Sequence, residues 1–170
     1  PARAFKNCTS FDRVALPMGL LTIGDEAFAG CSKVGSLTLP ESLTSIGARA
    51  FNGWALLDVV TIPDSVTFIG SGAFAGCTAV RQVRMPSNVA TVSATYPDAY
   101  AEIVRVTIPN NSTAIIAGFL NGCTSITSFD IPLSVTEIGD NAFRGCKNLS
   151  GITLPNGLEK IGSYAFYGCT

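Results

Sequence analysis

A proline recurs at intervals of 23 residues along the whole chain, with no insertion or deletion between copies. The positions are Pro17, Pro40, Pro63, Pro86, Pro109, Pro132 and Pro155. An isoleucine or valine follows each proline after six residues, and in most copies a glycine, an Ala-Phe pair and a cysteine come later at fixed distances. A fixed period in the twenties indicates a solenoid, in which each repeat forms one turn and is buried only by its neighbours.

Six full repeats and two partial repeats account for every residue of the chain. Residues 1–16 form the second part of one repeat, and 155–170 begin another; the full repeats are 17–39, 40–62, 63–85, 86–108, 109–131 and 132–154. We expect residues 1–170 to form a single solenoid domain. Solenoids usually need polar capping repeats. Because none is visible here, we expect this chain to be a segment of a longer protein.

Each repeat contains three recognisable stretches. The alternation of apolar and polar residues before each proline, as in Val83-Arg84-Met85, predicts a short strand, and these strands would stack into a parallel sheet. The stretch ending in Ile-Gly predicts a second extended segment, whose glycine would turn the chain with a positive φ. The Ala-Phe-x-Gly-Cys stretch predicts one short helical turn, with its Phe and Cys pointing inward.

Composition excludes several function classes. The chain has no histidine, which removes the usual general base and the commonest metal ligand. Its 11 basic and 12 acidic residues leave no global field to hold nucleic acid. The charge-free stretch 106–129 contains Pro109 and several polar residues, so it does not predict a membrane-inserted helix. We expect no enzyme, no cofactor and no metal.

The repeat resembles the BspA-like, or Treponema-type, leucine-rich repeat family. The residues that carry the resemblance run from Val59-Val60-Thr61-Ile62-Pro63 through Ile69-Gly70 to Ala73-Phe74-Ala75-Gly76-Cys77. The resemblance implies a β-rich, α/β-type leucine-rich-repeat solenoid, coiled as a right-handed superhelix with a parallel sheet on one face and short helical or irregular turns opposite. It also implies an extracellular or cell-surface module, without catalytic residues, that adheres to proteins or glycans.

Six cysteines fall in one inward column, in which Trp54 and Tyr100 replace cysteine in two repeats. A column that accepts such rings is a packing column, so the sequence favours buried thiols that behave as small hydrophobes. Adjacent repeats would still bring some pairs within disulfide range, namely Cys8–Cys31, Cys123–Cys146 or Cys146–Cys169. Ligands 23 residues apart in a straight column do not converge on a zinc ion.

Two features are candidates for ligand binding. Arg81, Arg84 and Arg105 fall on or next to one strand face in adjacent repeats, where they could receive an acidic peptide, a sulfated sugar or a carboxylate. Asp58, Asp98 and Glu102 could instead neutralise them. Tyr96 and Tyr100 lie in the most divergent repeat, 86–108. They either present aromatic rings to a partner or fill core space.

Four N-x-S/T sequons make Asn7, Asn110, Asn111 and Asn148 candidate glycosylation sites if the source exports the protein and glycosylates it.

The two ends of the solenoid would expose apolar side chains and strand edges. The candidate end-stacking residues are Phe5, Cys8, Ile161, Phe166 and Cys169. Such edges can add another copy of the chain in a head-to-tail contact. The alternative function is therefore a structural subunit of an extracellular filament or coat.

Overall fold

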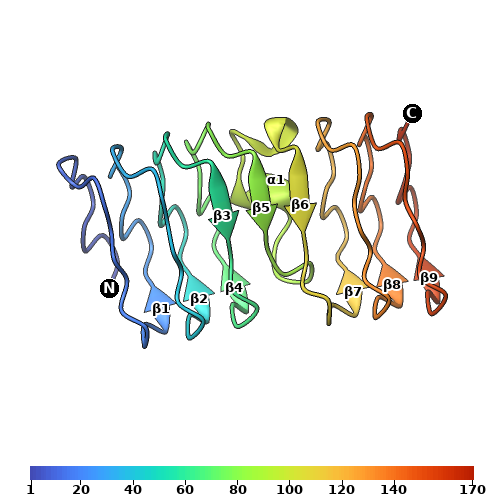
Figure 1. Cartoon of the computed structure of the whole chain (residues 1–170), viewed down its shortest axis with the longest axis horizontal. Coiled ribbons are helices and arrows are strands. Elements are labelled where there is room, and N and C mark those ends of the chain that lie inside the picture. The colour runs from blue at the N-terminus through green and yellow to red at the C-terminus, as the bar shows by residue number, and fades with distance from the viewer.

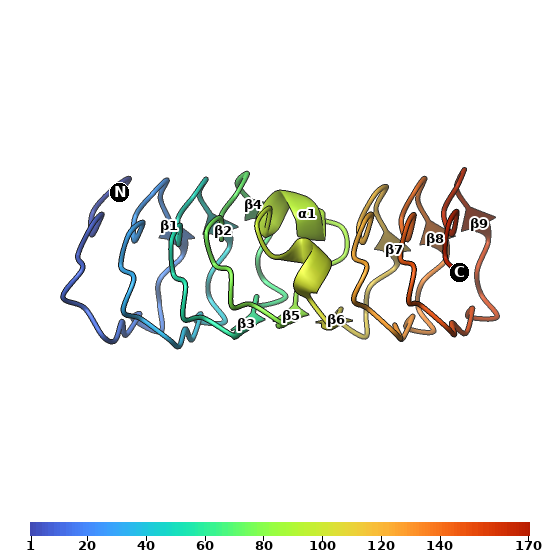
Figure 2. The ribbon, with the colours of Figure 1, turned by 90° about the horizontal axis from the view of Figure 1, so that it is seen from above.

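The computed structural model describes residues Pro1–Thr170 and is a solenoid of stacked turns, one per repeat. The two ends of the chain lie at opposite ends of an elongated body, and successive turns lie side by side (Figures 1 and 2). Every strand pair is parallel, and paired residues are 23 positions apart, as in Ile23↔Ile46 and Ile46↔Ile69. The predicted parallel-strand solenoid is therefore confirmed.

The Ile-Gly segments form two of the three sheets. Each strand is two residues long, with an inward-pointing isoleucine as its second residue. One sheet contains β1 (Thr22–Ile23), β2 (Ser45–Ile46) and β4 (Phe68–Ile69), and the other contains β7 (Ala114–Ile115), β8 (Glu137–Ile138) and β9 (Lys160–Ile161). The second extended segment predicted from the sequence is thus present in these six turns.

The segments before the prolines form a sheet in only three turns. These strands are β3 (Val59–Thr61), β5 (Gln82–Arg84) and β6 (Arg105–Thr107), which pair in that order. Elsewhere on this side, which we call the front face, the only pairing is an isolated bridge between Ser128 and Gly151. The predicted front strands therefore form a continuous ladder in the middle of the solenoid only.

The Ala-Phe-x-Gly-Cys stretch forms hydrogen-bonded turns that do not extend into a regular helix, which corresponds to the irregular alternative of the prediction, and its Phe and Cys are buried as expected at Phe74 and Cys77. Within a turn, the Cys77 N–H donates to the Phe74 carbonyl at 3.2 Å. Alternate residues also donate to the neighbouring repeat, as from Phe28 N–H to the Ala50 carbonyl at 2.8 Å. This second ladder would compete with the bonds of a helix, because each backbone N–H has one main acceptor.

The glycine after each buried isoleucine has a different role from the one predicted. Its φ is not positive; the glycine before each cysteine has that conformation instead, as at Gly76 (φ 73°). A Cβ added at Gly70 would lie 2.3 Å from the Ala48 nitrogen, and at Gly139 2.4 Å from the Ala117 nitrogen. Glycine is needed there because the backbones of two turns approach closely.

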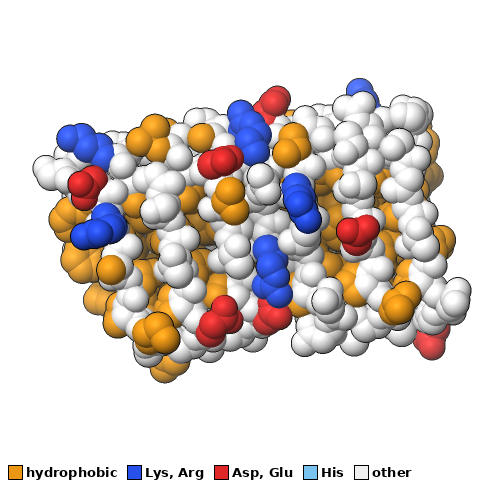
Figure 3. All heavy atoms as spheres, in the orientation of Figure 1, with side chains coloured by type: hydrophobic (Ala, Val, Ile, Leu, Met, Phe, Trp, Pro, Cys, Tyr) orange, Lys and Arg blue, Asp and Glu red, His pale blue; other side chains and the backbone are white.

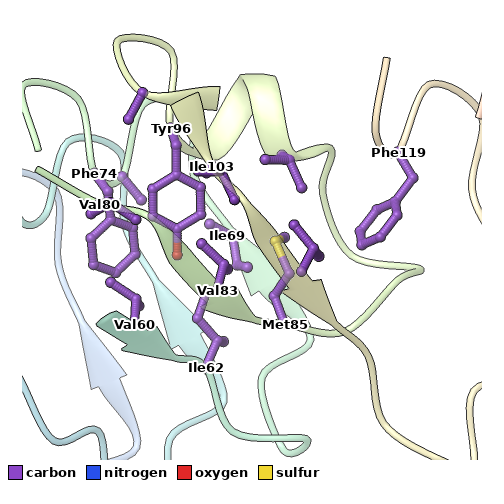
Figure 4. Packing of buried hydrophobic residues seen from close by; sticks show 14 of the residues in the cluster. Val60, Ile62, Ile69, Phe74, Val80, Val83, Met85, Tyr96, Ile103 and Phe119 are labelled. Carbon is purple, nitrogen blue, oxygen red and sulfur yellow. The ribbon is translucent and has the colours of Figure 1, made fainter. Parts of the chain in front are cut away.

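The core is one cluster of 42 buried residues that runs the length of the solenoid. Phe28, Phe51 and Phe74 stack along the axis, with ring centroids 5.8 and 5.0 Å apart. Tyr96 continues the stack at 5.0 Å from Phe74. Figure 4 shows the rings of Phe74 and Tyr96 side by side, with aliphatic side chains such as Val83 and Ile103 packed around them.

Repeat 86–108 interrupts the regular architecture. In place of an Ile-Gly strand it forms the short helix α1 (Val92–Thr95), capped by the Thr91 side chain, and then the 3-10 turn η1 (Tyr100–Glu102). Figure 2 shows the helical ribbon of this segment interrupting the otherwise uniform row of turns. As a result, β4 and β7 do not pair, and their two sheets are separate.

Candidate functional site

The three candidate arginines lie on the front sheet, on two neighbouring repeats. Arg84 is the last residue of β5 and pairs with Thr107, whereas Arg105 is the first residue of β6 and pairs with Gln82. Arg81 precedes β5, and its carbonyl accepts the amides of Val104 and Arg105. Basic side chains gather over β5 and β6 in the middle of this face (Figure 3). We call these three residues the arginine patch.

The arginines differ in how far the protein neutralises them. Arg84 Nη1 lies 2.6 Å from Asp64 Oδ1. Arg81 Nη1 donates only to backbone carbonyls, those of Thr78 and Val80, at 2.8 and 3.0 Å. Neither Arg81 nor Arg105 forms an ion pair with a carboxylate. Two cations of the patch are therefore free to receive an anionic group.

The predicted neutralising residues are not the ones that the arginines use. Asp58 and Glu102 form no salt bridge, and Asp98 Oδ2 accepts the Gly76 amide at 2.6 Å. Apolar side chains border the patch, since Val59 and Val104 are each 49% exposed. The surface therefore combines free positive charge with accessible apolar area.

The two candidate tyrosines are not surface groups of equal standing. Tyr96 is fully buried, so the prediction that it presents its ring to a partner is wrong, and the core-filling alternative describes it. The aromatic stack explains this position, because the ring replaces the expected Phe one residue early. Tyr100 is half-buried and packs against the core. The Tyr100 ring also lies close to the next turn, since a Cβ added at Gly122 would be only 3.0 Å from the Tyr100 Cε2 atom.

All six cysteines are free, and none of the conceivable disulfides is formed. The column has a chemical as well as a packing role. Cys77 Sγ donates to the Phe51 carbonyl at 3.3 Å, Cys146 Sγ donates to the Leu120 carbonyl at 3.2 Å, and Trp54 Nε1 makes the equivalent bond to Phe28 at 2.9 Å. A donor at this position thus satisfies a buried carbonyl of the preceding repeat.

Burial keeps these thiols protonated. Desolvation raises the pKa of Cys77 and of Cys146 to about 12, and it raises the pKa of Cys31 and Cys169 in the same direction. The thiolate is the nucleophile and the metal ligand, so the raised pKa values make the buried thiols Cys77 and Cys146 poor nucleophiles in the folded protein. No group of three or more Cys, Asp or Glu side chains could hold a metal ion.

The candidate glycosylation sites are all on the surface. Asn7, Asn110 and Asn111 are exposed. Asn148 is also exposed, but its Nδ2 donates to the Thr124 carbonyl at 2.8 Å, so a glycan there would replace a hydrogen bond.

The end-stacking candidates occupy the first and last turns. Phe5 is 45% exposed and Ile161 is 49% exposed. Cys8, Phe166 and Cys169 are each half-buried against the core.

One exposed cluster was missed by the sequence reasoning. Tyr164 and Tyr167 are 66% and 61% exposed, and Arg144 lies beside them. The signal was available, because both tyrosines stand at positions of the repeat that hold Asn141 and Arg144 one turn earlier.

The comparisons with known proteins agree with this architecture. The sequence model of the family described as "BspA type Leucine rich repeat region" matches residues 1–118 and 117–170, in six copies. A crystal structure of a leucine-rich repeat protein from Bacteroides ovatus is similar over 99% of this chain, with 29% identity and a TM-score of 0.61. The chain spans 55% of that protein.

Two further crystal structures are similar. The T. pallidum leucine-rich repeat protein shares 28% identity over 99% of this chain and 68% of its own, with a TM-score of 0.54. A leucine-rich cell surface protein from Faecalibacterium prausnitzii shares 28% identity over 99% of this chain and 60% of its own, with a TM-score of 0.48. No curated protein matches the chain. Its helices are all too short, or too polar, to cross a bilayer.

Proposed function

Because the chain belongs to the BspA-type leucine-rich repeat family, we propose that it is a non-enzymatic module that binds an acidic protein segment through the arginine patch. Proteins with this repeat generally act as interaction scaffolds, and no catalytic family matches the chain. The fold supplies a rigid row of turns, and function then depends on the side chains that point outward from it.

The observation that carries the proposal is the pair of free cations on the front sheet. Arg81 and Arg105 have no carboxylate partner, although Arg84 next to them has one. An arginine presents a planar fork of donors that matches a carboxylate, and the attraction to an acidic ligand falls with salt. A free guanidinium on a regular sheet therefore favours an acidic ligand.

The apolar side chains beside the patch favour a protein over a sulfated glycan. Val59 and Val104 would remain uncovered by a polyanionic sugar but could pack against the side chains of a peptide. We further propose that this binding is adhesive and takes place outside the cell, as the family resemblance implies.

The test uses two defined probes, a glutamate-rich peptide and heparin, with binding measured at low and physiological salt. We expect the peptide to bind and the double variant Arg81→Ala/Arg105→Ala to weaken it by about tenfold or more. Arg13→Ala is the matched control, because Arg13 is exposed on the same face but lies outside the patch. Equal loss in the control would refute a specific site, and binding of heparin alone would replace the protein ligand with a glycan.

A further inference from the structure

Two exposed tyrosines form a cluster on the turns opposite the front sheet. Tyr164 and Tyr167 meet edge to face with ring centroids 5.7 Å apart. The Arg144 guanidinium lies 5.6 Å from the centre of the Tyr167 ring, within the range of a cation–π contact. Most other aromatic rings of the chain are more deeply covered, whereas these two are 66% and 61% exposed. Core packing therefore does not account for them.

Tyr164 stands at a position of the repeat where the backbone is left-handed. Its φ is +55°, and the equivalent residues of six other turns share this positive φ: Arg3, Glu26, Arg49, Gly72, Gly118 and Asn141. Because glycine, asparagine and long side chains all occur there, this backbone conformation belongs to the repeat. What distinguishes the last turn is that the side chain at this position is an aromatic ring exposed to solvent.

The cluster carries a positive charge that the protein does not neutralise. Arg144 is exposed and belongs to none of the four salt bridges; its Nη1 donates to Asn141 Oδ1 at 3.4 Å. The nearby carboxylate of Asp140 is already used, since Oδ1 accepts the Ser163 amide at 2.7 Å. The charge of Arg144 is thus available to a partner.

We infer that Tyr164, Tyr167 and Arg144 form a second protein-docking surface, for a segment that carries a carboxylate beside an apolar side chain. Tyrosine and arginine are the residues most enriched at interface hot spots, and the cation–π contact holds them in place before binding. A sugar is disfavoured because Arg144 already covers one face of Tyr167, the surface on which a sugar ring would stack. This surface is independent of the proposed function, because it lies away from the arginine patch.

The test is a selection of displayed random peptides on the immobilised chain, followed by affinity measurements with the best synthetic peptide. We expect the selected peptides to combine Asp or Glu with an adjacent apolar residue. Tyr164→Gly/Tyr167→Ser should weaken binding by about tenfold or more, and Arg144→Ala should weaken it and reduce its salt dependence. Tyr164→Gly is a fold-preserving change, because glycine already occupies this position at Gly72 and Gly118.

Two controls make the outcome decisive. Phe68→Ser removes an aromatic side chain of similar exposure on another part of the surface and should leave the affinity unchanged. Arg81→Ala/Arg105→Ala should also leave it unchanged, so failure of one surface does not imply failure of the other. The inference is overturned if no peptide is enriched, if the tyrosine variants bind as well as the parent, or if only a glycan array gives a signal that these tyrosines control.

Discussion

Replacing Tyr96 with phenylalanine should stabilise the protein. The Tyr96 side chain is fully buried, and its hydroxyl has no hydrogen-bond partner. Figure 4 shows this oxygen directed into the apolar interior. Burial also raises the pKa of the phenol well above its ordinary value, as expected for a hydroxyl far from water.

The magnitude follows from the cost of an unsatisfied polar group. A buried donor or acceptor without a partner costs about 1–3 kcal/mol, and Tyr96→Phe removes that cost while it keeps the ring. The ring itself is compatible, because Phe28, Phe51 and Phe74 occupy the same stack. We expect a gain of about 1–2 kcal/mol, and roughly 2–4 °C in Tm per kcal/mol for a chain of this size.

Urea denaturation followed by the fluorescence of Trp54, which is wholly buried, measures the change. The reciprocal variant Phe74→Tyr is the control, since it would place a second hydroxyl in the stack and should lower stability. If Tyr96→Phe is neutral or destabilising, the hydroxyl has a partner in solution, such as a buried water, and the reasoning is refuted.

The remaining predictions concern the regular repeats and their junctions. Gly70→Ala should destabilise the protein by about 3 kcal/mol, because the new Cβ would lie 2.3 Å from the backbone nitrogen of Ala48. Gly19→Ala is the control and should change stability by about 0.5 kcal/mol or less, because a Cβ at Gly19 meets nothing within 4 Å. Urea titrations of both variants measure the difference. Burial raises the pKa of Cys77 from 9.0 to about 12, so the thiol ionises at lower pH in the unfolded chain than in the folded protein. The free energy of unfolding should therefore be constant below about pH 9 and fall between about pH 9 and about pH 12. In urea titrations across this range, the decrease should be smaller for Cys77→Ala than for the parent. At least five backbone hydrogen bonds join repeats 17–39 and 40–62, but two join 86–108 and 109–131, so native-state amide exchange should be fastest at the second junction; uniform protection along the chain would contradict this.

The 23-residue period made the architecture predictable, because residues 23 positions apart must occupy the same place in successive turns. Ile23, Ile46 and Ile69 lie in register and are buried, as their spacing requires. The pattern could not say why glycine follows them. A glycine that recurs every 23 residues is compatible with a positive φ or with a close contact between backbones. Only the positions of the neighbouring turns distinguish these two explanations.

The candidate site was predictable only in part, because side-chain partners do not follow the repeat. Adjacent strands placed Arg84 and Arg105 on one face, which the spacing implied. The pairing of Arg84 with Asp64 depends on the residue directly after Pro63, a position at which the residue type changes from repeat to repeat. The depth of Tyr96 depends on α1, which forms in a repeat of unchanged length and replaces a strand.

Inward and outward positions of the repeat therefore carry different information. Core packing constrains the residues at inward positions. Even where Trp54 replaces cysteine, the side chain keeps the buried hydrogen bond to the preceding repeat. Core packing does not constrain the outward residues. Thr38 and Thr61, for example, are exposed on the front face, where the strand propensity of threonine is enough to explain them. A substitution that leaves a charge unpaired, as at Arg105, or exposes an aromatic ring, as at Tyr167, does not stabilise the fold. In a solenoid this regular, exposed residues that differ from the repeat pattern without stabilising the fold are the best candidates for contact with a partner.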